Sequence, residues 1–145
     1  MRKFNILSAG FDNSSDRDGY RWRAARVGKA VGGEQIGAGL YELGDGQRSW
    51  PYHFHHGTEE WLLVVSGSPT VRTPEGERVL REGDVLCFPV GAAGGHQVTG
   101  PGTVLIISDK PALDIAEFPD SGKVAMRPPG LILRTADKAG YWDGE

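Results

Sequence analysis

The chain has 145 residues, a formal net charge of −3, 22 glycines and 9 prolines. This length suits a single domain, residues 1–145, with a real core, and the weak negative charge argues against nucleic acid or an anionic membrane surface as a partner. Cys87 is the single cysteine, so no internal disulfide can form. A lone cysteine is more often a small buried hydrophobic residue than a nucleophile.

The N-terminal segment has no recognisable targeting signal. Met1 to Leu7 has a basic opening but lacks the apolar run of a signal peptide. No stretch approaches the ~18 consecutive apolar residues that a membrane helix needs. We therefore expect a cytoplasmic protein.

Short apolar or alternating runs between turn signals predict a chain of strands rather than helices. Residues 1–20 are expected to be irregular, with 12–19 as a polar loop. A strand that carries histidines is expected after Pro51, and others are expected at about 20–27, 35–43, 60–65, 70–73, 77–80, 85–88, 96–98, 103–107 and 112–118. The run 60–65 predicts a strand buried on both faces. The remainder from Pro119 is expected to be mostly coil, with a helical turn near 135–139.

About nine short strands with frequent turns predict an all-β fold, either a small β-barrel or a jelly roll. An irregular N-terminal segment and a coil-rich C-terminal tail complete this expectation. The sequence contains no repeat and no low-complexity linker that would divide it.

The segment His53–Glu60 contains the most informative pattern in the chain. His53 and His55 stand two residues apart, so on an extended strand both rings point to the same face. Glu60 can return to that face if residues 56–58 turn, and His96 can close the set. Imidazole and carboxylate groups together suit a divalent transition metal.

The neighbouring residues of the same types have a simpler interpretation. His56 has the wrong parity relative to His53 and His55, so it is expected to face away. Glu59 is out of phase with Glu60 and is expected to be solvated. All four histidines fall in two short windows, which makes a chance arrangement a poor explanation.

The segment from Gly46 to Gly100 resembles the cupin superfamily, whose motif core spans about residues 46–100. The first motif of that family is matched by His53-x-His55, four residues, Glu60, six residues and Gly67. The second is matched by Gly83, five residues and Pro89-x-Gly91, followed by His96. Four residues rather than two separate Gly91 from His96, and Gly100 replaces the usual asparagine.

The resemblance implies one divalent ion (Fe, Mn, Ni, Cu or Zn) held by His53, His55, Glu60 and His96. It also implies a homodimer, because members of this superfamily commonly pair. Tyr41 is a candidate for the substrate pocket, because glycines on its own strand face leave room beside it.

Three functions remain open at the level of sequence. The first is a metal-dependent enzyme, dioxygenase- or isomerase-like, that acts on a small substrate which chelates through oxygen. The second is a non-catalytic module that binds a small molecule or a structural metal, and the third is a metal-free sugar epimerase or isomerase. The residues identify no catalytic acid or base, no second cofactor and no substrate.

Overall fold

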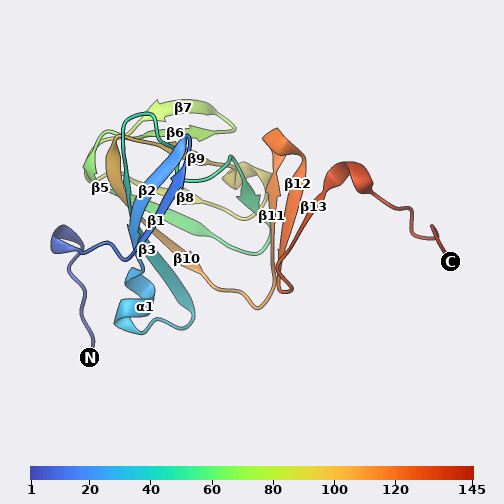
Figure 1. Cartoon of the computed structure of the whole chain (residues 1–145), viewed down its shortest axis with the longest axis horizontal. Coiled ribbons are helices and arrows are strands. Elements are labelled where there is room, and N and C mark those ends of the chain that lie inside the picture. The colour runs from blue at the N-terminus through green and yellow to red at the C-terminus, as the bar shows by residue number, and fades with distance from the viewer.

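The computed structural model describes residues 1–145 and is built mainly of antiparallel strands (Figure 1). The strands are β1 Asn13–Arg17, β2 Tyr20–Ala25, β3 Ile36–Leu43, β4 Phe54–His55, β5 Glu60–Gly67, β6 Thr70–Thr73, β7 Gly76–Val79, β8 Val85–Phe88, β9 Gln97–Thr99, β10 Gly102–Asp109, β11 Asp114–Phe118, β12 Lys123–Arg127 and β13 Leu131–Arg134. The helical pieces are α1 Val27–Val31 and the 3-10 turns η1 Ile6–Ser8, η2 Ala92–Gly94, η3 Pro119–Ser121 and η4 Thr135–Asp137. The expected all-β class is confirmed.

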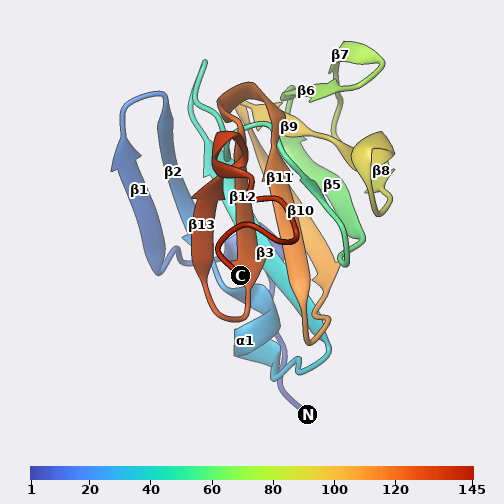
Figure 2. The same ribbon diagram turned by 90° about the vertical axis from the view of Figure 1, so that its right-hand side faces the viewer.

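The strands form three sheets that together make a jelly-roll type of barrel. The largest has the order β1-β2-β3-β10-β5-β8, the second β13-β12-β11-β4, and the third β7-β6-β9. The second sheet lies in front of β3 and β10 when the molecule is viewed from its C-terminal side (Figure 2). Sequence neighbours are often separated in the sheets, since β10 pairs with both β3 and β5.

The main core lies inside the barrel and follows the alternation of the strands. Leu62 and Val64 of β5 are almost fully buried, as are Val104 and Ile106 of the adjacent β10. They join a single cluster with Leu43, Val71, Leu80, Phe88 and Val98. Ile106 of this cluster also lines the cavity described below.

The outer face of the largest sheet has a second, smaller core. Ala25, Val27, Leu40 and Leu105 are buried there beneath the N-terminal segment, which includes Phe4 and Phe11. This cover is incomplete over β5. The expectation that β5 is buried on both faces is therefore wrong, because Trp61 is 48% exposed.

Two expectations for the N-terminal third are also wrong. The polar segment 13–17 is not a loop but strand β1, which pairs along its full length with β2. The strand expected over 20–27 ends at Ala25, and α1 follows, closed by Gly32 in the left-handed conformation with φ of 82°. The side to which Cys87 points, which the sequence did not decide, is the exposed face of β8, opposite Trp61.

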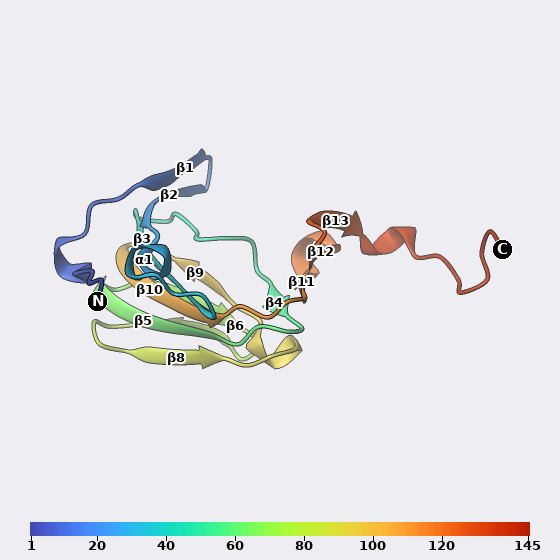
Figure 3. The ribbon, with the colours of Figure 1, turned by 90° about the horizontal axis from the view of Figure 1, so that it is seen from below.

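The expectation of a coil-rich tail is only half right. Residues 123–134 form the hairpin β12–β13, which extends β11 into a sheet because all three strands pair in register. Beyond η4 the chain leaves the barrel and runs outward to the C-terminus (Figure 3). None of the helical segments has the length and apolar character required to cross a bilayer.

Candidate metal centre

Two of the sequence-predicted ligands, His53 and His96, are joined directly through the backbone. The His53 N–H donates to the His96 carbonyl at 3.2 Å, and the His96 N–H donates back to the His53 carbonyl at 2.9 Å. His55 lies two residues further on, in β4, which pairs with β11. Glu60 begins β5, so the turn at residues 56–59 returns the chain to the same side.

These side chains converge at the inner end of the barrel cavity. One ligand atom each from His53, Glu60 and His96 lie within 4.8 Å of one another. His55 lies outside this compact trio but reaches it through Glu60, because its Nε2 is 3.5 Å from Glu60 Oε2. His96 Nε2 is 3.2 Å from the same oxygen. The structure therefore brings all four predicted residues together.

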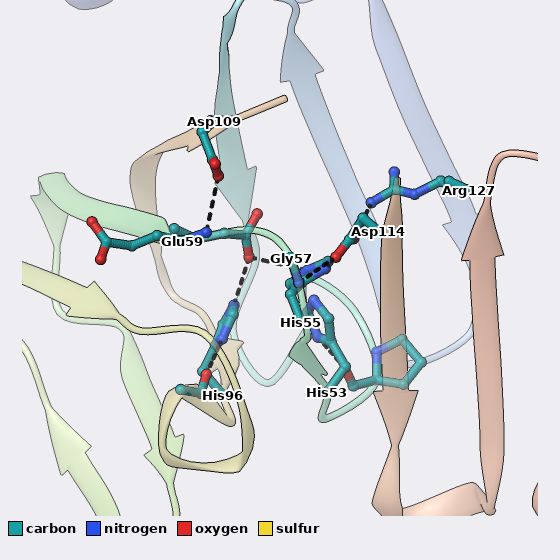
Figure 4. A network of polar contacts seen from close by, with 11 residues as sticks. His53, His55, Gly57, Glu59, His96, Asp109, Asp114 and Arg127 are labelled. Carbon is teal, nitrogen blue, oxygen red and sulfur yellow. Dashed lines mark hydrogen bonds and ion pairs between the residues drawn. The ribbon is translucent and has the colours of Figure 1, made fainter. Parts of the chain in front are cut away.

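Each of the three histidines uses its Nδ1 atom to hold its ring in place. His53 Nδ1 lies 3.0 Å from the Pro51 carbonyl, and His96 Nδ1 lies 2.9 Å from the Gly94 carbonyl. His55 Nδ1 lies 2.7 Å from Asp114 Oδ2 (Figure 4). Carbonyl and carboxylate oxygens only accept, so each Nδ1 carries a proton, and each ring in its neutral form presents the lone pair of Nε2.

The site is consequently rich in hydrogen-bond acceptors and poor in hydrogen-bond donors. His96 is 1% exposed, and its Nε2 has no hydrogen-bond partner. Three Nε2 lone pairs and the Glu60 carboxylate face the same small space, and such groups repel unless a cation lies between them. Nitrogen and oxygen donors of this kind fit a divalent transition metal.

The pKa values of the site reflect the same conflict. Burial, and then the charges of His96 and His55, lower the pKa of His53 to about 4. Burial opposes the charged forms of Glu60 and His55, but their mutual contacts outweigh it. They hold the pKa of Glu60 far below its usual range and raise the pKa of His55. Thus Glu60 is ionised, and positive charge is favoured beside it.

Asp114 is a functional residue that the sequence did not reveal. It begins β11, is 5% exposed, and accepts hydrogen bonds from the backbone N–H of Gly57 at 3.1 Å and from Arg127 at 3.2 Å as well as from His55. These donors lower its pKa despite burial. A buried carboxylate behind a ligand histidine fixes the ring and strengthens its basicity.

Replacing Asp114 with asparagine is expected to weaken metal binding about 10–100-fold, the effect typical of losing a carboxylate partner of a histidine ligand. Asparagine keeps the shape but removes the charge that holds the His55 ring. Titration with a divalent metal by calorimetry measures the change.

Glu117→Gln provides the matched control for this substitution. Glu117 lies on the same strand and contacts His56 Nε2 at 2.7 Å, but this pair is on the outer face of the sheet. The control should retain the affinity of the unmodified protein. Equal affinities in the Asp114 variant and the unmodified protein would show that this carboxylate does not support the centre.

His56 and Glu59 face away from the centre, as expected from their parity. His56 is exposed and pairs with Glu117. Glu59 is exposed, and its side chain accepts a hydrogen bond from the Trp61 indole at 2.8 Å. Neither residue contributes to the cluster.

The centre opens on a cavity of about 490 Å³ between the two larger sheets. Its walls come from β3 and β10 on one side and from β11 and β12 on the other. They consist of Arg26, Gly37, Ala38, Gly39, Tyr41, Trp50, His53, His55, Glu60, Ile106, Ser108, Ala116, Phe118, Ala125 and Arg127. Three residues of the cluster, His53, His55 and Glu60, are therefore accessible to a small molecule, whereas His96 lies behind them.

Tyr41 lies in this lining, on the strand face where the sequence predicted it. Its ring occupies the space beside Gly39, since a Cβ there would lie 2.6 Å from the Tyr41 ring. Burial, and then the charge of Glu60, raise the pKa of Tyr41, so the phenol keeps its proton at neutral pH. It is a potential hydrogen-bond donor to a ligand, and that contact remains a prediction.

A row of aromatic rings leads from the cavity mouth to the histidines. Tyr41 contacts Trp22 edge-on at 5.7 Å and Trp50 at 4.6 Å between ring centres. Phe118 stacks on His53 at 5.6 Å. Phe118 comes from β11, whose position beside the cavity could not be read from spacing along the chain.

Comparison with known proteins agrees with the fold. Residues 39–108 match the model of the family described as "Cupin domain". The sequence has no match among curated proteins.

Several solved structures are similar to this chain over most of its length. A candidate sugar phosphate isomerase from Acidithiobacillus ferrooxidans is 29% identical, with a TM-score of 0.76 over 84% of this chain and 81% of that one. A sugar phosphate isomerase of the cupin superfamily from Silicibacter pomeroyi is 24% identical, with a TM-score of 0.81 over 97% and 98%. A cupin-like protein from Thermotoga maritima is 19% identical, with a TM-score of 0.58 over 77% and 86%.

Proposed function

Because the chain belongs to the cupin superfamily, we propose that it is a metal-dependent isomerase acting on a small, oxygen-chelating substrate of the sugar phosphate class. The proposal depends first on the metal centre. His53, His55, Glu60 and His96 are the proposed ligands, and the ion is Fe, Mn, Ni, Cu or Zn.

The observation that carries the proposal is the excess of buried acceptors. The Nε2 atoms of His55 and His96 approach the Glu60 carboxylate within 3.5 Å and 3.2 Å, and His96 Nε2 has no hydrogen-bond donor. A bound divalent ion relieves this conflict and supplies a Lewis acid for a carbonyl or hydroxyl oxygen of the substrate.

Catalysis is favoured over a purely structural role because the cluster opens on the cavity. A structural metal site is normally closed and saturated by protein ligands. Here the adjoining space of about 490 Å³ suits a small molecule. Within it, Tyr41 is held as a neutral phenol that can donate a hydrogen bond to a substrate oxygen.

The reaction class comes from the comparisons. The candidate isomerase from Acidithiobacillus ferrooxidans shares 29% identity across 84% of this chain. Isomerisation of a hydroxy-carbonyl compound has two requirements: a polarised carbonyl group, and transfer of a proton between neighbouring carbons. It consumes no oxidant. A Lewis acid beside a phenol donor suits the first of these requirements.

The direct test is turnover by protein reconstituted with each candidate ion. A panel of aldose and ketose phosphates in deuterated buffer, followed by proton NMR, should reveal interconversion and solvent deuterium in the product. Chelation should abolish the signal, and return of the ion should restore it. Metal-loaded protein that binds these compounds but converts none would instead indicate a non-catalytic binding module. Turnover that survives full removal of metal would indicate a metal-free isomerase.

We also expect the protein to be a homodimer. The edge strand β13 leaves Leu131 and Leu133 each 48% exposed, and an exposed apolar edge favours self-association. Sedimentation equilibrium at micromolar concentration should give twice the mass of one chain. A monomer at that concentration would contradict the expectation.

A further inference from the structure

A second cavity, of about 550 Å³, lies across Trp50 from the metal pocket. The indole of Trp50 lines both spaces. The walls of the second cavity come from the β1–β2 hairpin, the segment 48–52 and the start of β12. They comprise Ser15, Arg17, Tyr20, Trp22, Arg48, Ser49, Trp50, Pro51, Tyr52, Gln97, Asp120, Ser121 and Lys123.

The hairpin presents one face of alternating residues to this cavity. Ser15 is opposite Trp22, and Arg17 is opposite Tyr20, so all four side chains lie on the same face of the pair. Asp16 lies between them in sequence and therefore on the other face. Strand alternation thus places Arg17, which is exposed, on the cavity side of the hairpin and Asp16 on the opposite side.

The cavity has a surplus of positive charge. Three cations line it, Arg17, Arg48 and Lys123, and none of them forms an ion pair in the structure. The one acid in the wall, Asp120, is already held by both terminal nitrogens of Arg72. The two arginines of the metal pocket differ, because Arg26 pairs with Asp12 and Arg127 with Asp114.

Two of these cations have contacts with neighbouring residues of the protein. Arg48 donates from Nε to the Gly19 carbonyl at 3.3 Å, and its guanidinium lies 4.5 Å from the centre of the Tyr20 ring. Lys123 Nζ lies 5.4 Å from the centre of the Phe118 ring. The remaining guanidinium N–H groups and the ammonium stay available to a ligand.

The wall also contains a polar group whose hydrogen-bonding capacity is unused. Ser49 is 1% exposed, and its hydroxyl has no hydrogen-bond partner. Gln97, in contrast, is satisfied, because its amide donates to the Trp50 carbonyl at 2.7 Å. Buried polar groups of this kind are usually paired, so an unpaired hydroxyl in a cationic cavity is consistent with a missing acceptor.

We infer that this second cavity binds a tetrahedral, phosphate-type anion, with Arg17, Arg48 and Lys123 as its cationic ligands and Trp22 and Trp50 as flat apolar walls. Charge-assisted hydrogen bonds from several donors are the usual means of holding such an anion. The inference rests on residues outside the metal centre and does not require a metal.

The test is calorimetric titration of the metal-loaded protein with inorganic phosphate, sulfate and acetate in separate experiments. Phosphate and sulfate should bind, and acetate should bind much more weakly. The double variant Arg17→Gln with Lys123→Gln should weaken phosphate binding by about tenfold or more, since two charge-assisted contacts are lost. The metal content of this variant should equal that of the unmodified protein.

The matched control removes one arginine and one lysine charge elsewhere, through Arg81→Gln with Lys138→Gln. These residues do not line the cavity, so phosphate should bind as before. The inference would be overturned if the unmodified protein did not bind phosphate. It would also be overturned if the cavity variant bound phosphate as tightly as the unmodified protein. Equal losses in the cavity and control variants would overturn it too, because they would indicate net charge alone. None of these outcomes depends on turnover, so the anion site and the isomerase proposal can fail separately.

Discussion

Replacement of His55 with alanine is expected to abolish stoichiometric metal binding while the β-rich fold persists. The His55 ring is nearly buried, is held by Asp114 at 2.7 Å and presents Nε2 toward Glu60. Removal of a direct ligand should weaken affinity by more than the roughly 10–100-fold that follows loss of an outer partner. Elemental analysis of purified protein, with circular dichroism as a check of fold, measures the result.

His56→Ala is the matched control for His55→Ala. The two histidines are adjacent, but His56 is exposed and pairs with Glu117 on the outer face. The control should keep a full equivalent of metal. If the His55 variant holds as much metal as the control, the assignment of His55 as a ligand is wrong.

Replacement of Gly94 with alanine is expected to disrupt the centre from a distance, because this residue shapes the loop that carries His96. A Cβ at position 94 would overlap the carbonyl oxygen of Pro89 and approach the Pro89 carbonyl carbon at 2.9 Å. Both obstacles are backbone atoms, so no side-chain rotation relieves them. Such overpacking costs about 1–3 kcal/mol or forces the loop to move.

Movement of this loop would displace His96 directly. The Gly94 carbonyl accepts the hydrogen bond from His96 Nδ1, and the Gly94 N–H closes the turn onto Gly91 at 2.9 Å. We expect at least a tenfold loss of metal affinity together with a lower Tm. Metal titration and thermal unfolding of the variant test both effects.

Ala93→Ser is the control for the loop variant. Ala93 occupies the same 3-10 turn, but it is exposed, so the added hydroxyl meets solvent. This variant should match the unmodified protein in affinity and in Tm. A Gly94 variant that also matched it would show that the loop accommodates the Cβ and that Gly94 does not govern the position of His96.

The same loop explains the departure from the family spacing that the sequence showed. The two extra residues between Gly91 and His96 are absorbed by the 3-10 turn η2, which spans Ala92–Gly94. The chain then re-enters the barrel at His96, opposite His53. The family resemblance predicted His96 as a ligand, but the way in which a longer loop keeps its side chain beside His53 depends on the backbone.

The shared facing of His53 and His55 was predictable from sequence because strand parity is strict. His53 and His55 had to share a face if the segment was extended, and His56 had to face away. The apolar strands that hold the centre, such as β5 and β10, were also predictable, since their alternating or continuous apolar runs lie between glycine and proline turns.

Asp114 could not be predicted from sequence. Its contact with His55 spans 59 positions and exists only because β4 pairs with β11. No local pattern distinguishes this carboxylate from the other acids of the chain. Its role follows from tertiary pairing alone.

The strands at the two ends were missed for a related reason. β1 reads Asn-Ser-Ser-Asp-Arg, which has the composition of a loop, and it is a strand because β2 provides a complete pairing edge. In β12 the cavity side carries the small residue Ala125 between Lys123 and Arg127, so the apolar alternation is weak. In both cases the partner strand, rather than the local sequence, determines the conformation.

The reciprocal backbone hydrogen bonds between His53 and His96 should form the site before an ion binds. Two proposed ligands from segments more than forty positions apart are tied by main-chain hydrogen bonds that do not use their side chains. Ion capture therefore requires little ordering of the polypeptide, and its entropic cost should be small. One ion should exchange for another without opening the barrel, so amide hydrogen exchange at His53 and His96 should be equally slow in the apo and loaded forms.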